Sequence, residues 1–257
     1  MRFRIKVYKV VKKIPEGKFL SYKEVAKRAG NKKAFRIVGN LMAQNKNPEI
    51  PCHRVIKNNN EVGEYQGFFK NSWKKAALLL KEGAIGVIPT DTIYGVCGSV
   101  FKKQTVEKIY KLRRRDPKKP MIVLISSFDD LFQLGIKLEA WQKKILKQLW
   151  PGKVSVVLKC PFKKFEYLHR GTKTLALRLP KKKELIKILK VSGPLVAPSA
   201  NLEGEKPAET INEARRYFKD KVFYYSKVKL RYNKRKLKGK VSTLIDLTQK
   251  NIKVLRK

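Results

Sequence analysis

The pattern of apolar residues changes near residue 70, and this change constrains the fold more than any other feature of the sequence. Before it, apolar residues recur at helical spacing, as in Val7, Val11 and Ile14. After it, short apolar runs that are typical of strands alternate with helical stretches. We therefore expect two domains, residues 1–70 and residues 71–257.

The smaller domain is predicted to carry a helix-turn-helix. Ser21 is a candidate N-cap for a helix that begins at Tyr22, and Gly30 with Asn31 ends that helix. A second helix is expected over about residues 33–44. Two short helices joined by a tight turn that contains glycine are typical of this motif, although many small helical domains share the pattern.

The larger domain alternates helices with strands, which predicts an α/β fold with a twisted mixed sheet, or α+β over the whole chain. Helices are expected at 73–81, 106–114, 139–149, 183–190 and after Thr210, and strands at 85–89, 121–125, 155–159, 174–178, 195–197, 222–225, 242–247 and 252–255. The polar stretch Lys57–Glu64, just before the domain boundary, is predicted to be a surface turn.

The charge of the chain is strongly basic, with 62 Lys and Arg against 20 Asp and Glu. Residues 1–70 carry 17 basic and 5 acidic side chains, so the excess is not confined to a tail. It favours polyanions, such as nucleic acids, nucleotide phosphates or anionic membranes, without naming one. No apolar run approaches the ~20 residues of a membrane span. With no apparent signal peptide and three cysteines, we expect a cytoplasmic protein without membrane association.

A cysteine stands beside two potential cations in the segment Pro51-Cys52-His53-Arg54. Cationic neighbours favour the thiolate, which is the nucleophilic form of cysteine. From these four residues alone, the alternative is a buried and unreactive Cys52.

The segments around this cysteine follow one another in a characteristic order. They are Ile14-Pro-Glu-Gly17, Ser21-Tyr22, Ala34-Phe-Arg-Ile-Val-Gly39, Pro51-Cys-His-Arg-Val55 and Val62-Gly-Glu-Tyr65. The order resembles the C-terminal domain of methylated-DNA–protein-cysteine methyltransferases over about residues 3–68. The resemblance implies a helix-turn-helix, winged-helix-like domain that binds double-stranded DNA. It also implies that Cys52 takes the alkyl group and His53 acts as the base.

Four residues are expected to contact DNA on the strength of this resemblance: Tyr22, Arg36, Asn47 and Arg54. Glu82, in a Leu-Leu-Lys-Glu-Gly segment, is the candidate for the glutamate of the family. The alternative is a module that binds and flips alkylated bases without accepting the alkyl group.

Three segments of the larger domain carry hydroxyls and cations suited to a ligand. Pro89–Gly95 (PTDTIYG) follows a predicted strand, as does Ser199-Ala-Asn201, and Arg113, Arg115 and Lys119 gather at a helix end. Arginine forks and a lysine charge suit a triphosphate, while the alternative is a solvated basic helix end. The sequence has no Gly-x-x-x-x-Gly-Lys motif, so an ordinary P-loop NTPase is not expected.

Further segments in the same order complete a second resemblance. They are Trp150-Pro-Gly152, Leu177-Arg-Leu-Pro180, Ser242-Thr-Leu-Ile-Asp246 and Leu255-Arg256. The set resembles the YrdC-like threonylcarbamoyl-AMP synthases over about residues 72–257. It implies that L-threonine, bicarbonate and ATP give threonylcarbamoyl-AMP and pyrophosphate for the adenosine-37 modification of tRNA. The alternative is an RNA-binding YrdC-type module without synthase activity.

The second resemblance assigns residues to ligands. The L-threonine contacts would be Thr92, Ser199, Ser242 and Lys182, and the ATP contacts Arg113, Arg115, Lys119, Arg178, Ser199, Asn201 and Arg256, with Arg115 catalytic. Arg113 replaces the usual Lys, and Lys182 stands where a His often binds threonine. ATP would be a substrate accompanied by Mg²⁺, with no metal held tightly by the protein. Proteins of the tRNA pathway would take up the product.

Overall fold

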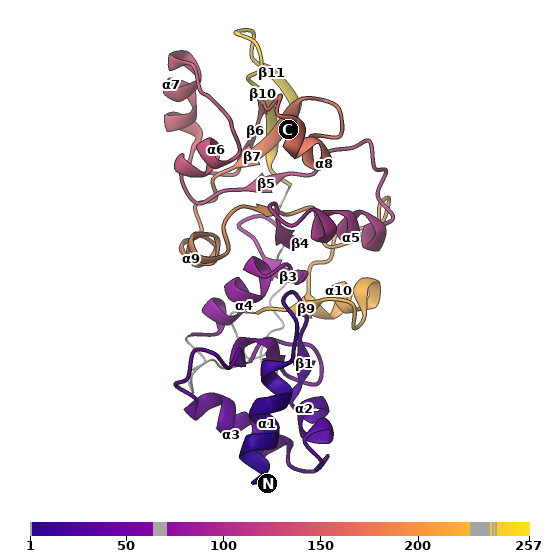
Figure 1. Cartoon of the computed structure of the whole chain (residues 1–257). Helices are drawn as coiled ribbons and strands as arrows, with labels where there is room; N and C mark the ends of the chain where they lie inside the picture. The colour runs from indigo at the N-terminus through magenta and orange to yellow at the C-terminus, as the bar shows by residue number, and fades with distance from the viewer. Residues whose placement is uncertain (1, 64–70, 227–236, 238, 240) are drawn as a thin grey trace.

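The computed structural model describes residues 2–63, 71–226, 237, 239 and 241–257, and Glu64 and Tyr65 of the first motif lie outside them. The molecule is elongated, with three helices at one end and a large sheet at the other (Figure 1). The three helices are α1 (Phe3–Lys12), α2 (Tyr22–Arg28) and α3 (Phe35–Gln44). No helix in the described part of the chain is long and apolar enough to cross a membrane.

The predicted helix-turn-helix is present as α2 and α3. The Ser21 hydroxyl accepts a hydrogen bond from the Glu24 backbone N–H at 3.1 Å, which confirms the N-cap. Gly30, at φ +95°, ends α2 in a conformation that other residues rarely adopt. A two-stranded parallel sheet lies beside the helices, formed by β1 (Leu20–Ser21) and β2 (Val55–Ile56). The apolar faces of all three helices pack into one core that includes Cys52.

The larger part is built on a mixed sheet, as predicted. Among the described residues its strand order is β11-β10-β6-β7-β5-β8-β4-β3-β9. The strands are β3 (Gly86–Pro89), β4 (Tyr94–Ser99), β5 (Val123–Leu124), β6 (Val154–Lys159), β7 (Thr174–Arg178), β8 (Leu195–Val196), β9 (Phe223–Tyr224), β10 (Thr243–Asp246) and β11 (Lys253–Arg256). Parallel and antiparallel neighbours alternate irregularly, so segments distant in the sequence meet at shared strand ends.

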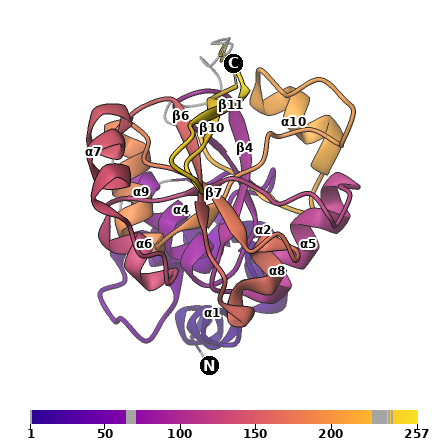
Figure 2. The ribbon, with the colours of Figure 1, turned by 90° about the horizontal axis from the view of Figure 1, so that it is seen from above.

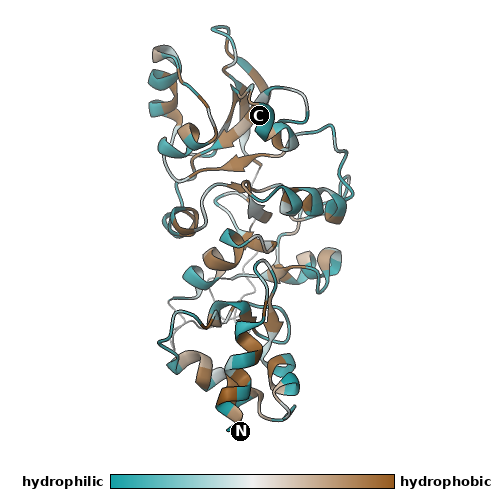
Figure 3. Ribbon diagram, in the orientation of Figure 1, coloured by the Kyte–Doolittle hydropathy of each residue, from teal (hydrophilic) through white to brown (hydrophobic). Residues whose placement is uncertain are grey.

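Helices cover both faces of this sheet. They are α4 (Ser72–Lys81), α5 (Lys103–Arg113), α6 (Asp129–Gln133), α7 (Ala140–Leu149), α8 (Glu166–His169), α9 (Lys183–Ser192) and α10 (Ile211–Phe218). Figure 2 shows α4, α7 and α9 on one side and α5, α8 and α10 on the other. The strands between them are apolar and the outward helix faces are polar (Figure 3). This two-sided burial explains why the strands read as continuous apolar runs.

The two parts of the molecule share a core around α4. Ile56 and Val62 from the smaller part pack in one cluster with Leu79 and Leu80 of α4 and with residues of α9 and β9. Burial of this kind stabilises by roughly 25 cal/mol per Å² of apolar surface. Helix α4 therefore contributes to both parts at once.

The predicted surface turn is only partly a surface feature. Residues 57–59 are exposed, but 61–63 are buried. The Val62 backbone N–H donates to the Tyr224 carbonyl at 2.9 Å, and the Tyr224 N–H donates to the Asn60 carbonyl at 2.8 Å. Glu61 also bridges Tyr224 and forms an ion pair with Arg215 at 3.0 Å. The prediction was wrong for these three residues because they continue the large sheet beyond β9.

Candidate functional site

A cavity of about 230 Å³ opens at the strand ends of the larger part. Seven of the predicted ligand residues line it: Thr92, Arg113, Arg115, Arg178, Ser199, Ser242 and Arg256. They come from loops, strands and the end of α5, up to 164 positions apart from Thr92 to Arg256. Lys119, Lys182 and Asn201 do not line it. Four arginines around one cavity make it strongly attractive to an anion.

Hydroxyl groups form a second part of the lining. Thr90 Oγ1 and Thr92 Oγ1 are 3.1 Å apart, and Thr90 is held in turn by the Ile93 carbonyl. The Ser242 hydroxyl lies 2.8 Å from the Ser155 hydroxyl and accepts from Arg256 Nη2 at 3.3 Å. These contacts hold the hydroxyls in a fixed orientation toward the cavity.

Lys182 forms hydrogen bonds to the backbone of the loop that carries Thr90 and Thr92. Its ammonium donates to the carbonyls of Pro89 at 3.1 Å and Thr90 at 2.9 Å. Both carbonyls lie at the end of β3, where the chain turns toward Thr92. The geometry makes Lys182 a contact of the loop, and its predicted contact with threonine remains a prediction.

Arg113 is the most buried cation of the cavity, with 3% of its surface exposed. Its guanidinium donates to the carbonyl of Asn201 from Nε at 3.0 Å, and from Nη2 to the Asn201 side chain at 3.1 Å and the Ser199 hydroxyl at 3.2 Å. Its Nη1 has no hydrogen-bond partner among the described residues. Burial, with repulsion from Arg115 added, lowers the pKa of Arg113 to about 10. The group stays charged at neutral pH and keeps unused donors.

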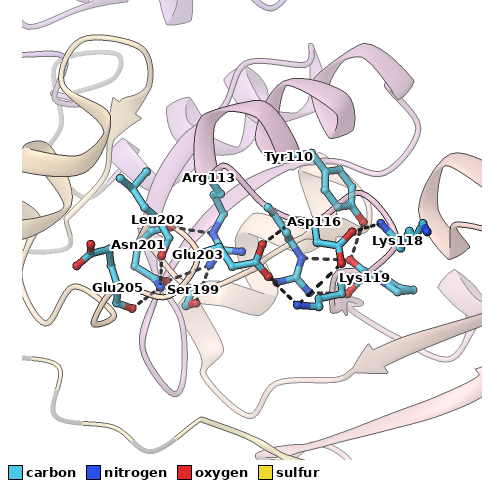
Figure 4. Close-up of polar contacts among 12 residues, drawn as sticks. Tyr110, Arg113, Asp116, Lys118, Lys119, Ser199, Asn201, Leu202, Glu203 and Glu205 are labelled. Atoms are coloured by element: carbon cyan, nitrogen blue, oxygen red, sulfur yellow. Dashed lines mark hydrogen bonds and ion pairs between the residues drawn. The ribbon is translucent and has the colours of Figure 1, made fainter.

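The loop after α5 holds the next two predicted cations (Figure 4). Arg115 donates from Nε to the Lys119 carbonyl at 3.1 Å and from Nη2 to the Pro120 carbonyl at 3.0 Å. The Tyr110 hydroxyl also donates to the Lys119 carbonyl, at 3.0 Å. Glu203 reaches the same loop, with its Oε1 3.5 Å from the Lys119 ammonium. The loop backbone thus fixes the orientation of Arg115 before any ligand arrives.

Arg178 pairs with a carboxylate that the sequence motifs did not single out for a role. Its Nη2 lies 3.0 Å from Asp91 Oδ1, and both side chains are almost fully buried. Burial lowers the pKa of Arg178, while Asp91 acts in the opposite direction. Arg178 Nε has no hydrogen-bond partner within the described residues, so this guanidinium also retains a donor. Asp91 lies between Thr90 and Thr92 in the sequence, and this position within the motif could have identified it as a residue of the site.

A second candidate site surrounds Cys52 in the smaller part. Its Sγ accepts a hydrogen bond from Asn45 Nδ2 at 3.2 Å, and 8% of the residue is exposed. Burial raises the pKa of the Cys52 thiol, opposed by this hydrogen bond and by the charge of Lys75. Asn47 was predicted to contact DNA, whereas Asn45 was not predicted to have a role. In the structure Asn47 is exposed and accepts, through its carbonyl, from Asn45 Nδ2 at 2.8 Å.

Glu82 reaches His53, as its candidate position required. His53 Nε2 lies 2.7 Å from Glu82 Oε1, and since a carboxylate can only accept, the histidine nitrogen donates. Arg54 donates to the same carboxylate from Nε at 2.8 Å and from Nη2 at 2.9 Å. Burial alone would raise the pKa of Glu82, but the bonds from His53 and Arg54 lower it to about 2. The carboxylate is therefore ionised and holds the imidazole of His53 through its Nε2.

The side chains of Arg54 and Tyr22 form contacts within the protein. Besides Glu82, Arg54 donates from Nη1 to the Ile14 carbonyl at 2.6 Å. The ammonium of Lys75, a residue of α4 with 1% of its surface exposed, lies 3.4 Å from the Tyr22 hydroxyl. It also donates to the Val55 carbonyl. The expected DNA contacts of Arg54 and Tyr22 remain predictions.

The exposed face of α3 carries the remaining predicted DNA contact. Arg36 lies over the ring of Phe35, with 5.9 Å between its Cζ and the ring centroid. Phe35 and Ile37 are 37% and 52% exposed, which is unusual for large apolar side chains. An apolar surface with a flanking cation is suited to insertion between bases.

No group of three or more His, Cys, Asp or Glu side chains that could hold a metal ion occurs in the part of the chain that the structure describes. The cavity lining is cationic, so the described residues do not fit a metal held by the protein alone.

Comparison with known families agrees with both resemblances. Residues 78–257 match the family model of Sua5, YciO and YrdC, described as "Telomere recombination". Residues 2–84 match the model described as "6-O-methylguanine DNA methyltransferase, DNA binding domain". The two matches overlap at residues 78–84, within α4 and the turn after it.

Individual relatives point the same way for the larger part. The threonylcarbamoyl-AMP synthase of Bacillus subtilis is 34% identical over 138 residues, which are 53% of this chain and 40% of that protein. The one from Pyrococcus abyssi is 31% identical over 180 residues, 68% of this chain and 50% of that protein. The chain thus spans half or less of the length of these two relatives. The structure of P. abyssi Sua5 complexed with L-threonine is 27% identical, with a TM-score of 0.65 over 76% of this chain and 56% of that one.

Proposed function

The chain belongs to the Sua5–YciO–YrdC family over residues 78–257, and from this premise we propose that its larger part is a threonylcarbamoyl-AMP synthase. The observation that carries the proposal is the cavity, in which seven predicted ligand residues meet. The lining presents the hydroxyls of Thr92, Ser199 and Ser242, which suit the polar groups of L-threonine. It also presents arginines, and Arg113 and Arg178 keep unused donors that suit a triphosphate.

The proposed reaction needs charge stabilisation more than covalent catalysis. The threonine amine and bicarbonate give a carbamate and water. A carbamate oxygen then attacks the α-phosphorus of ATP. The bond between this phosphorus and the oxygen that bridges to the β-phosphate breaks, and pyrophosphate leaves with that oxygen. Negative charge grows on the phosphoryl oxygens and on the leaving group, and Arg113, Arg115 and Arg178 are available to stabilise it. Any Mg²⁺ would enter the cavity bound to the nucleotide.

An activity assay with a matched pair of variants tests this proposal. Purified protein is incubated with ATP, bicarbonate and labelled L-threonine, and threonylcarbamoyl-AMP and pyrophosphate are measured. Arg115→Ala should abolish the activity because Arg115 lines the cavity. Lys118→Ala, which removes an exposed cation from the same loop, should leave it intact. Wild-type protein that forms neither product refutes the synthase and favours an RNA-binding module without activity.

For the cell, the proposal implies a cytoplasmic enzyme. Its product would pass to the proteins that complete the adenosine-37 modification of tRNA. Because threonylcarbamoyl-AMP is a mixed anhydride, the consuming step would transfer its threonylcarbamoyl group to a nucleophile and release AMP.

A second function is favoured by the arrangement around Cys52. We propose that the smaller part binds double-stranded DNA and takes a methyl group from O6-methylguanine onto Cys52. The Glu82–His53 bond at 2.7 Å supports this, because it fixes the imidazole of the residue next to Cys52, which would accept the thiol proton directly or through water. The sulfur would attack the methyl carbon as the guanine O6 leaves and takes a proton.

Mass spectrometry after incubation with O6-methylguanine DNA tests this second proposal. One added methyl on Cys52 is expected, while Cys97 and Cys160 stay unmodified because both are fully buried, whereas 8% of Cys52 is exposed. DNA binding that leaves Cys52 unmodified would instead indicate a module that only binds and flips the damaged base.

A further inference from the structure

Glu203 is a carboxylate at the edge of the cation-lined cavity, and none of the motifs assigns it a role. Its Oε2 accepts a short hydrogen bond of 2.6 Å from the Asp116 backbone N–H. Its Oε1 lies 3.5 Å from the Lys119 ammonium and 3.8 Å from Arg115 Nη1. Figure 4 shows this carboxylate between α5 and the loop that follows it.

The backbone of Glu203 is bonded to the same region. Its N–H donates to the Arg113 carbonyl at 2.8 Å, at the last residue of α5. Two residues earlier, Asn201 holds the Arg113 guanidinium through its carbonyl and side chain. Residues 199–203 therefore contact both the end of α5 and the loop 114–120. The side chain of Glu203 is the part of this segment that reaches Asp116.

Charge gives Glu203 a second effect on the cavity. Arg115 lowers the pKa of Arg113 by repulsion, and Glu203 counteracts this shift. The hydrogen bond from Asp116 lowers the pKa of Glu203, and so do Lys119 and Arg115, so the carboxylate is ionised at neutral pH. A fixed anion at this point reduces the repulsion between Arg113 and Arg115, which both line the cavity.

We propose that Glu203 is a positioning residue of the triphosphate site, a role that rests on the proposed use of ATP. It holds the loop 114–120 against residues 199–203, so that Arg115 faces the same anion as Arg113. The shortest contact of the carboxylate is to the backbone of Asp116. Loop geometry, more than charge, is therefore what Glu203 supplies.

Three variants separate geometry from charge. Glu203→Ala removes the acceptor of the Asp116 N–H and the charge. Glu203→Gln removes the charge but keeps a carbonyl acceptor. Glu205→Ala removes a charge from an exposed position in the same turn and serves as the matched control. The dissociation constant of ATP is measured by calorimetry at low and high salt, together with KM and kcat, and the amide exchange of Asp116 is measured in protein without ligand.

Positioning predicts that Glu203→Ala raises the dissociation constant of ATP about tenfold, the loss typical of a hydrogen bond to a charged group. It should raise KM more than it lowers kcat, and speed the exchange of the Asp116 amide. Glu203→Gln should stay within about threefold of the wild type, since it restores the acceptor. Glu205→Ala should match the wild type.

Two outcomes would overturn the proposed role of Glu203. Removing an anion near a triphosphate would by itself tighten ATP binding, so a Glu203→Ala protein that binds ATP equally well or better overturns the proposal. Unchanged exchange at Asp116 overturns it as well. If the wild type binds no ATP, the proposed synthase fails, and the exchange measurement alone decides whether Glu203 holds the loop.

Discussion

Replacing Glu82 by glutamine should destabilise the protein in a way that depends on pH. Glu82 lies at the end of α4, and its carboxylate accepts from His53 at 2.7 Å and from Arg54 Nε at 2.8 Å. Only 16% of its side chain is exposed, so solvent screens these contacts weakly. Glutamine has the same shape but cannot carry the charge, and the substitution therefore isolates the charge.

The magnitude follows from the pKa. In the folded protein the pKa of Glu82 is about 2, against 4.5 for the ordinary group. At ~1.4 kcal/mol per pKa unit, the ionised carboxylate stabilises the fold by about 3 kcal/mol at pH 7. Because the folded pKa is the lower one, this stabilisation is present above about pH 4.5 and declines as the pH falls toward 2. By pH 3 it should have shrunk by about 2 kcal/mol.

Urea unfolding of the wild type and of Glu82→Gln at a series of pH values measures this difference. The free energies of unfolding should differ by about 3 kcal/mol at pH 7 and converge toward pH 3. Glu24→Gln is the control, because Glu24 forms an exposed ion pair with Arg28 worth less than about 1 kcal/mol. A difference for Glu82→Gln that is absent, or equal at every pH, would refute the reasoning.

Further substitutions give distinct outcomes. Gly86→Ala should lower the melting temperature, because a Cβ would lie 2.3 Å from the ring of Phe223 on β9. Gly39→Ala should raise the melting temperature slightly, because the space around Gly39 is open and alanine has the higher helix propensity. Asn45→Ala should slow the alkylation of Cys52 by iodoacetamide, since it removes the hydrogen bond that lowers the pKa of the thiol. Burial lowers the pKa of Lys75 to about 7, below its unfolded value of 10.5. The free energy of unfolding of the wild type, relative to that of Lys75→Met, should therefore rise by about 2 kcal/mol from pH 7 to pH 9. Two curves of unfolding free energy against pH that run parallel would contradict this.

Much of the fold was predictable because local signals and tertiary structure agree. The cap at Ser21 and the apolar runs at residues 174–178 needed no knowledge of their partners. Strand β4 was not predicted, since Tyr94–Ser99 contains two glycines and directly follows a polar loop. It forms because β3 and β8 lie on either side of it and complete its hydrogen bonds.

The candidate sites were predictable where a motif carries the residue. The arginines and hydroxyls of the cavity stand in such motifs, and the sheet brings them together. Asn45, Lys75 and Glu203 were not predicted, because each acts through a neighbour chosen by the fold. Glu203, for instance, contacts Asp116 across 87 positions of the sequence. Nothing in its immediate surroundings marks it as different from Glu205.

Helix α4 also affects how the gene could have been assembled and how the protein could be dissected. A break before Ser72 separates Cys52 and His53 from Glu82, so an isolated N-terminal fragment would keep the candidate nucleophile and lose the carboxylate that holds His53. A break after Glu82 instead strips the sheet of a helix that packs on α9 and exposes Leu79 and Leu80 to water. Neither fragment would inherit a complete interior. The two parts of the chain thus share one helix, and a recombination event that separated them would have to duplicate it.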